Sequence, residues 1–147
     1  MKIKLLILIL FFSISSWGQT TITTQNFGAT STMPSGWSGT NSWAGSTSAT
    51  STGYSGSSGA GKALFGNTGT NGNVGLLTYN NSLSTVGYTS ITVLWGARAT
   101  STFSQPVIFQ WSIDGSTWNT VSYTQVTADS NWYLANGGAR ISLPSGA

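Results

Sequence analysis

The chain of 147 residues contains no cysteine, no histidine and no glutamate, and Asp114 and Asp129 are its only aspartates. General acid–base catalysis needs a side chain that titrates near the working pH, and covalent catalysis needs a nucleophile with a base beside it. Composition also excludes zinc and iron sites built on histidine or cysteine. These absences predict a protein without catalytic activity of its own.

The first eighteen residues have the pattern of a cleaved signal peptide. A basic start, Met1-Lys2-Ile3-Lys4, precedes an apolar run that ends near Ile14, and small residues follow before Gln19. The run is shorter than the roughly 20 residues that span a bilayer. We therefore predict a secreted or cell-surface protein, residues 19–147, with no membrane span. Without cysteine, its stability must come from packing rather than from disulfides.

Charge is scarce after the predicted cleavage. Loss of Lys2 and Lys4 lowers the formal net charge from +3 to +1, leaving Lys62, Arg98 and Arg140 against the two aspartates. Nucleic-acid binding needs basic residues clustered on one face, and the sequence shows no such cluster. We expect no nucleic-acid partner.

The mature chain predicts one all-β domain, an antiparallel jelly-roll β-sandwich with a long Gly/Ser/Thr-rich loop. Short runs of β-branched and aromatic residues alternate with turn residues, and no window shows sustained helical periodicity. The segment 28–61 carries three aromatics among small polar residues, which favours a loop pinned to the sandwich over a flexible linker. The expected strands are residues 21–26, 63–65, 76–79, 89–99, 107–113, 117–124, 132–133 and 140–143.

A hairpin is expected around Asp114-Gly115. A two-residue turn would place Trp111 opposite Trp118, whereas an odd loop of three or five residues aligns Val121 with Phe109. Burial favours the odd loop and leaves Trp118 near the tip. The run Ser112-Ile113-Asp114-Gly115-Ser116-Thr117-Trp118 resembles the Asp-box hairpin, one residue shorter, and this resemblance implies a structural role for Asp114, Gly115 and Trp118.

A wider resemblance covers most of the mature chain. Its phrases are Gln25-Asn26-Phe27, Met33-Pro34-Ser35-Gly36-Trp37, Ala63-Leu64-Phe65, Leu83 to Tyr88, Ile91 to Arg98 and the Trp111–Trp118 hairpin. Their order is similar to that of choice-of-anchor J-like jelly-roll modules in proteins that gram-negative bacteria export by the type IX system. The resemblance implies downstream domains as partners and further strands after Leu143, so we expect the chain to be truncated at its C-terminus.

Three classes of function stay open: a binding module, a structural or adhesive module, and an enzyme that would need Asp114 or Asp129 to act as a base. A carbohydrate-binding module would stack sugars on loop or edge aromatics, and the candidates are Trp37, Trp43, Tyr54, Trp132 and Tyr133. A structural or adhesive module within a larger exported protein would need no ligand, and these rings would then pin loops. Trp95 and Trp111 alternate in phase with apolar neighbours, which favours core packing. Further alternatives are a stand-alone lectin-like domain and the remnant of a hydrolase's accessory domain.

We predict no catalytic residue, no metal ligand and no bound cofactor. Asp-Gly is a strong turn signal, and Asp129 has the context of a turn residue as well. Calcium prefers about six to eight oxygen ligands, so two aspartates would make at most a weak calcium site. The expected ligand is a polysaccharide or a cell-surface glycan.

Overall fold

A computed structural model describes most of the chain after residue 18. The described residues are 19–28, 32–40, 42–44, 50–59, 61–65, 75–80, 83–100 and 106–144. The predicted signal peptide lies outside them, as do several parts of the 28–61 segment. Among the described residues, no helix has the length and apolar character needed to cross a membrane.

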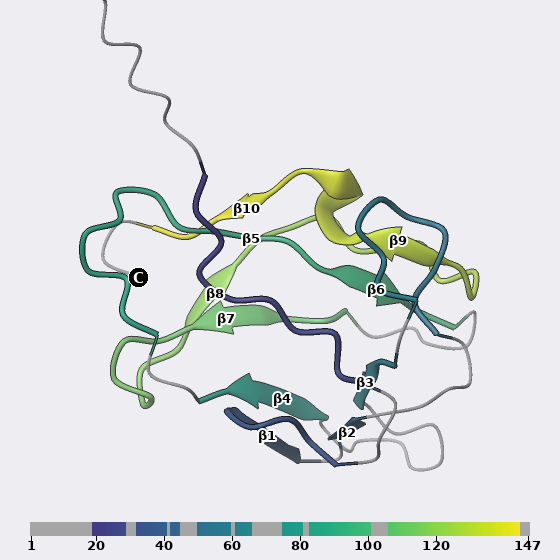
Figure 1. The fold of residues 1–147 in the computed structure, drawn as a ribbon, viewed down its shortest axis with the longest axis horizontal. Coiled ribbons are helices and arrows are strands. Elements are labelled where there is room, and N and C mark those ends of the chain that lie inside the picture. Colours follow the sequence, from purple (N-terminus) through teal and green to yellow (C-terminus); the bar gives the residue numbers. More distant parts are fainter. Residues whose placement is uncertain are drawn as a thin grey trace, which may run out of the picture.

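The predicted β-rich, antiparallel character is confirmed (Figure 1). Ten short strands form five two-stranded antiparallel sheets, and the described part of the chain contains no α-helix. The strands are β1 (Trp37–Thr40), β2 (Ser42–Ala44), β3 (Ala63–Phe65), β4 (Leu76–Tyr79), β5 (Thr92–Val93), β6 (Gly96–Arg98), β7 (Phe109–Trp111), β8 (Asn119–Val121), β9 (Trp132–Leu134) and β10 (Ile141–Ser142).

The strand pairs are nested along the chain. β7 pairs with β8, β6 with β9 and β5 with β10, so the described residues 91–100 and 106–143 follow the course of one antiparallel ribbon that doubles back at the 112–118 turn. The strands of the N-terminal half are nested in the same way, because β2 pairs with β3 inside the β1–β4 pair. Each nested pair is antiparallel, as a ribbon folded on itself requires.

The register of the long ribbon changes at one place. Eleven positions separate β6 from β7 (98 to 109) and β8 from β9 (121 to 132), so these two pairs stay in step. Between β5 and β6 the interval is three positions (93 to 96), but it is seven from 134 to 141. The four extra residues are the 3₁₀ turn η1 (Ala135–Gly138). This insertion interrupts the ladder, and the strand predicted over 89–99 is therefore two short strands.

Two hydrogen bonds join the turn η1 to Thr124, which follows β8. Asn136 and Gly137 adopt left-handed backbone angles, with φ of 56° and 62°. The Asn136 N–H donates to the Thr124 carbonyl at 3.0 Å, and the Thr124 N–H donates to Asn136 Oδ1 at 3.1 Å. Asparagine tolerates the left-handed region better than other side chains. The four-residue insertion is thus fixed to the end of β8.

The β7–β8 hairpin has the register expected from burial, with an odd number of residues in its loop. Phe109 lies opposite Val121 and Trp111 lies opposite Asn119. Seven residues, 112–118, separate the strands, so the expected loop of three or five residues was too short. The ladder ends early because Ser112 and Asp114 use their side chains to bond the turn's own N–H groups.

Aromatic side chains form two separate packed clusters. Trp95 contacts Phe109 and Tyr123, with ring centroids 5.0 and 5.1 Å away. Trp37 contacts Phe27 at 4.9 Å and Tyr79 at 5.0 Å. Among the described residues, the buried apolar side chains are only Ala135 and Ile141. The described part of the molecule is therefore held by half-buried aromatics rather than by a thick aliphatic core.

Two expectations about strands were wrong. Residues 21–26 form no strand, because the side chains of Gln25 and Asn26 accept hydrogen bonds from the N–H groups of Phe27 and Gly28 and turn the chain. β1 and β2 were not expected, since they lie in the Ser/Gly-rich segment. β1 forms because Gly36, with φ of 83°, completes a turn closed by Trp37 N–H to Pro34 O at 3.0 Å.

Candidate functional site

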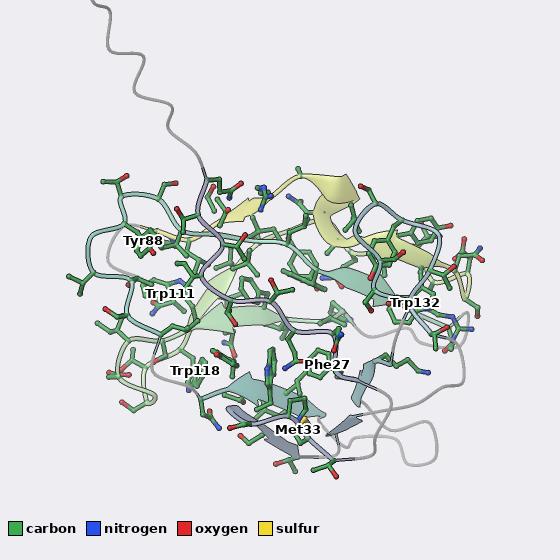
Figure 2. All side chains as sticks on the ribbon, viewed as in Figure 1. Phe27, Met33, Tyr88, Trp111, Trp118 and Trp132 are labelled. Carbon is green, nitrogen blue, oxygen red and sulfur yellow. The ribbon has the colours of Figure 1, made fainter. Side chains whose placement is uncertain are left out.

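A cleft of about 460 Å³ opens between the 50–59 loop and the start of β9. Its volume is in the range of small-ligand sites. Figure 1 shows the loop arched beside β6 and β9, and Figure 2 shows Trp132 at this end of the molecule. The lining residues are Thr52, Gly53, Ser130, Asn131, Trp132 and Tyr133.

Pairing of β9 with β6 positions the aromatic wall of this cleft. Trp132 lies opposite Arg98 and Tyr133 lies opposite Ala97. Neighbouring residues on a strand point to opposite faces, which makes Trp132 half-buried and Tyr133 exposed. Both residues line the cleft, with the Trp132 ring on the half-buried face of β9 and the Tyr133 ring on the exposed face.

Tyr54 places the 50–59 loop beside Trp132. Its ring centroid is 6.4 Å from that of Trp132, and the two planes are inclined by 40°. A Cβ added at Gly96 would overlap with the Tyr54 hydroxyl group, so β6 must carry glycine where the loop crosses it. The residue types at 54 and 96 are thus matched to each other.

The loop is a compact turn around Tyr54. The Ser57 N–H donates to Tyr54 O at 3.1 Å, and the Gly59 N–H donates to Ser51 O at 3.0 Å. The hydroxyl groups of Ser51 and Ser58 are 3.0 Å apart, and Ser51 is buried. Gly53 has a φ of 83°, a backbone region that favours glycine. Residues 50–59 of the 28–61 segment therefore form a loop pinned by an aromatic residue, whereas residues 37–40 and 42–44 of the same segment are the strands β1 and β2.

The opposite border of the cleft is the turn that begins at Asp129, and side-chain hydrogen bonds hold this turn. Asp129 Oδ1 accepts the Asn131 N–H at 2.9 Å, and Asp129 Oδ2 accepts the Tyr133 hydroxyl group at 2.6 Å. Ser130, with a φ of 68°, donates its N–H to Ala99 O at 2.9 Å and accepts Arg98 Nε–H on its carbonyl at 2.6 Å. The turn is tied both to β6 and to β9.

These hydrogen bonds fix the protonation states of two groups in the cleft. The Tyr133 hydroxyl group, and then the Asn131 N–H, hold the pKa of Asp129 below its ordinary value. The Asp129 carboxylate in turn raises the pKa of Tyr133. At neutral pH the carboxylate is ionised and the phenol is protonated. The arrangement offers ring stacking, hydroxyl and amide donors and acceptors, and one fixed anion.

Of the five predicted aromatic candidates, Trp132 and Tyr133 line the cleft, and Tyr54 contacts Trp132 beside it. Trp37 is elsewhere, packed between Phe27 and Tyr79, and its buried Nε1 has no hydrogen-bond partner among the described residues. Trp43 is the middle residue of β2, and its side chain lies outside the described part.

Sequence reasoning missed the polar residues of the cleft. Thr52, Ser130 and Asn131 come from two segments that lie almost eighty positions apart. The run Asp129-Ser130-Asn131 directly before Trp132 was a usable signal, because turn-forming polar residues beside an aromatic strand are typical of binding-site rims. Arg98, the last residue of β6, also bonds the cleft's turn through its Nε–H.

Asp114 has a different setting, in the 112–118 turn. Its Oδ1 accepts N–H groups of Ser116 at 2.8 Å and Thr117 at 2.7 Å, and the Ser112 hydroxyl group at 2.9 Å. These bonds hold the pKa of Asp114 well below its ordinary value. Trp118 is 45% exposed. Within the described ranges, no group of three or more acidic, histidine or cysteine side chains could hold a metal ion.

A second, smaller hollow of about 200 Å³ lies along β7 and β8. Its lining is mostly backbone and aliphatic, with Tyr123 and Gln125 bonded to Val107 rather than free. It brings together no set of convergent polar groups, so the cleft beside Trp132 is the stronger candidate.

Comparison of the chain with protein-family models, with curated proteins and with solved structures gives no match. The functional argument therefore depends on the geometry of the cleft.

Proposed function

We propose that this chain is a noncatalytic, exported module that binds carbohydrate in the cleft between the 50–59 loop and β9. The observation that carries the proposal is the contact of Tyr54 with Trp132, contributed by distant segments, beside a polar-rimmed hollow. Sugar rings present flat C–H faces that pack on aromatic rings, and their hydroxyl groups pair with side chains such as those of Asn131 and Asp129.

The angle between the rings of Tyr54 and Trp132 indicates which class of glycan would bind. Tyr54 and Trp132 are inclined by 40°, so they form a cleft rather than one flat platform. A flat platform suits the surface of a crystalline polysaccharide, whereas a cleft suits a single soluble chain. The proposal is therefore binding to individual glycan chains, at a cell surface or in an extracellular matrix.

The proposed architecture is a jelly roll within a larger exported protein. Support comes from the nested pairs β5–β10, β6–β9 and β7–β8, because a jelly roll is a long antiparallel ribbon wound into two facing sheets. The exported location is supported by the pattern of residues 1–18. Noncatalytic action is supported by the lack of histidine, cysteine and glutamate.

An adhesive or structural role is the second candidate. It is favoured by large apolar side chains that lie exposed outside the cleft, among them Ile108 and Ile113. Such side chains suit contact with neighbouring protein surfaces. The two roles are compatible if the module binds glycan on one side and protein on another.

The test is retention on a panel of soluble glycans in affinity electrophoresis. Trp132→Ala and Tyr54→Ala should each weaken binding about tenfold, which corresponds to about 1.4 kcal/mol of lost stacking. Trp118→Ala is the matched control, because Trp118 is exposed and lies toward the opposite end of the molecule in Figure 2. It should leave binding unchanged.

Melting curves of the same variants separate a binding role from a packing role. Loss of retention with a nearly unchanged melting temperature supports the proposal. If no glycan on the panel is retained by the unaltered chain, or if Trp118→Ala weakens binding as much as Trp132→Ala does, carbohydrate binding in this cleft is refuted.

A further inference from the structure

The turn that borders the cleft uses three of its hydrogen-bond donors within the protein. The Tyr133 hydroxyl group donates its only proton to Asp129 Oδ2 at 2.6 Å, and the Asn131 N–H donates to Asp129 Oδ1 at 2.9 Å. The Ser130 N–H donates to Ala99 O at 2.9 Å. All three donors belong to residues that line the cleft, and all three are engaged inside the protein rather than offered to a ligand.

Acceptor oxygens remain at the same border. A phenol oxygen keeps lone pairs after it has donated its proton, so Tyr133 Oη accepts a hydrogen bond while it donates to Asp129. Both side chains are exposed. The Asp129 carboxylate is ionised at neutral pH, because the bonds from Tyr133 and Asn131 hold its pKa below the ordinary value. A ligand at this border therefore meets acceptors, one of which is bonded directly to a negative charge.

The charges on the turn do not favour an anion. Arg98 is bonded to the turn through Nε–H to Ser130 O at 2.6 Å, but it is not among the residues that line the cleft. Its formal charge cancels that of Asp129. A carboxylate or sulfate brings only acceptors and negative charge, whereas a sugar hydroxyl group brings a donor. The acceptors at this border thus match hydroxyl groups of an uncharged sugar.

We propose that the cleft binds an uncharged glycan, and that Tyr133 selects it by accepting a hydrogen bond from a sugar hydroxyl group while Asp129 holds the phenol proton. This inference rests on the proposed carbohydrate binding and adds the charge of the sugar and a residue that determines specificity. Trp132, which also lines the cleft, supplies the stacking surface, and Tyr133 supplies the polar contact.

The experiment compares two pairs of polymers in affinity electrophoresis with the purified full chain. Polygalacturonate and its methyl ester have the same ring hydroxyl groups and differ in charge. Dextran sulfate differs from dextran in charge and in the hydroxyl groups that sulfate replaces. The uncharged member of at least one pair should bind at least about tenfold more tightly, and in neither pair should the anionic member bind more tightly. Added salt should leave retention of the uncharged polymer unchanged, because no ion pair with the ligand is involved.

Asp129→Asn tests the role of the carboxylate. The asparagine oxygen still accepts the Asn131 N–H, and the new NH₂ group faces Tyr133 and donates to its oxygen. The Tyr133 proton is then free to point into the cleft. The preference for the uncharged polymer should therefore fall at least about threefold. Asp114→Asn is the matched control, since it removes the same charge within the 112–118 turn, and it should leave the preference unchanged.

Tyr133→Phe tests the acceptor itself. This variant keeps the ring and removes the oxygen, so retention of the uncharged polymer should weaken about fivefold and that of the anionic polymer should not change. Tyr88→Phe is the matched control, because Tyr88 is 45% exposed and lies toward the opposite end of the molecule from Trp132 in Figure 2. Melting curves of all four variants show whether each is folded under the conditions of electrophoresis.

The outcomes distinguish this inference from the function on which it rests. Equal or tighter retention of the anionic polymers, lost in Trp132→Ala, overturns the preference for an uncharged glycan and leaves carbohydrate binding in place. Equal effects of Asp129→Asn and Asp114→Asn assign the preference to overall charge, and a Tyr133→Phe variant that binds like Tyr88→Phe removes the role of Tyr133. Either result also overturns the inference. No retention of any polymer overturns both proposals.

Discussion

At the scale of single residues, the chain uses side-chain hydrogen bonds to shape its turns. Ser112, Asp114, Asp129 and Asn136 each bond a backbone group within a few positions, and the turns they hold begin or end strands. Short polar side chains compete with ladder bonding in this way. This competition explains why several strands are only two or three residues long, and it gives the two aspartates a defined structural chemistry.

Acidification should destabilise the fold through Asp114. Its pKa is lowered below the ordinary value of 3.8 in the folded state, so its bonds contribute full stability above that pH. The contribution is lost as the pH falls through the folded-state pKa. Asp114→Asn keeps the shape without the charge. Its melting temperature should lie below that of the unaltered chain at pH 6, and the difference should shrink toward pH 2. A difference independent of pH would contradict this assignment.

Gly96→Ala should disturb the cleft through Tyr54. The new methyl group would overlap with the Tyr54 ring, and either β6 or the loop must shift. Overpacking of this kind typically costs about 1–3 kcal/mol. Urea unfolding should show that loss in the unaltered background and much less of it in Tyr54→Ala, where the ring is absent. Equal losses in both backgrounds would mean that the two residues are not coupled.

At the scale of elements, the sequence predicted the bounds of the short strands best. β3 and β4 lie at their predicted positions, and the parity of the β7–β8 hairpin follows from burial of Phe109 with Val121. The composition of β1, WSGT, did not predict a strand. The order of this strand depends instead on the cross-strand contact of Trp37 with Tyr79. Such a partner lies some forty positions away, and local periodicity does not identify it.

The cleft was predictable only in part, for a similar reason. Tyr54, Trp132 and Tyr133 were recognisable as loop or edge aromatics, but their meeting depends on the passage of the loop over Gly96. Long-range pairing of β6 with β9 brings these parts together.

Trp95 should contribute more to stability than any exposed tryptophan. It joins the β5–β6 connection to the β7–β8 hairpin through Phe109 and Tyr123. Because Trp95 is half-buried, Trp95→Ala should cost about 2–3 kcal/mol, somewhat below the loss typical of a fully buried ring. Trp118→Ala, the control, should cost less than about 0.5 kcal/mol. Urea unfolding measures both, and equal losses would show that the Trp95 cluster is not a stabilising centre.

At the scale of the whole molecule, low charge is combined with exposed apolar side chains. Val86 is 89% exposed, Ile113 is 77% exposed and Ile108 is 66% exposed. The formal net charge falls to +1 without Lys2 and Lys4. Net charge near zero gives little repulsion between copies, and exposed apolar groups favour their association. A surface of this kind fits a module that works against neighbouring surfaces.

The purified chain should therefore self-associate as its concentration rises. Sedimentation velocity over a tenfold range of concentration should show a rising mean sedimentation coefficient. Val86→Asn combined with Ile113→Asn should reduce that rise, because both positions lie in turns or loops where asparagine is well tolerated. Ser84→Asn, an exposed polar position close to Val86, is the control and should change nothing. High salt should not weaken the self-association, because salt ions do not screen apolar contacts. A coefficient that stays constant with concentration would show that these exposed side chains do not drive self-association of the molecule.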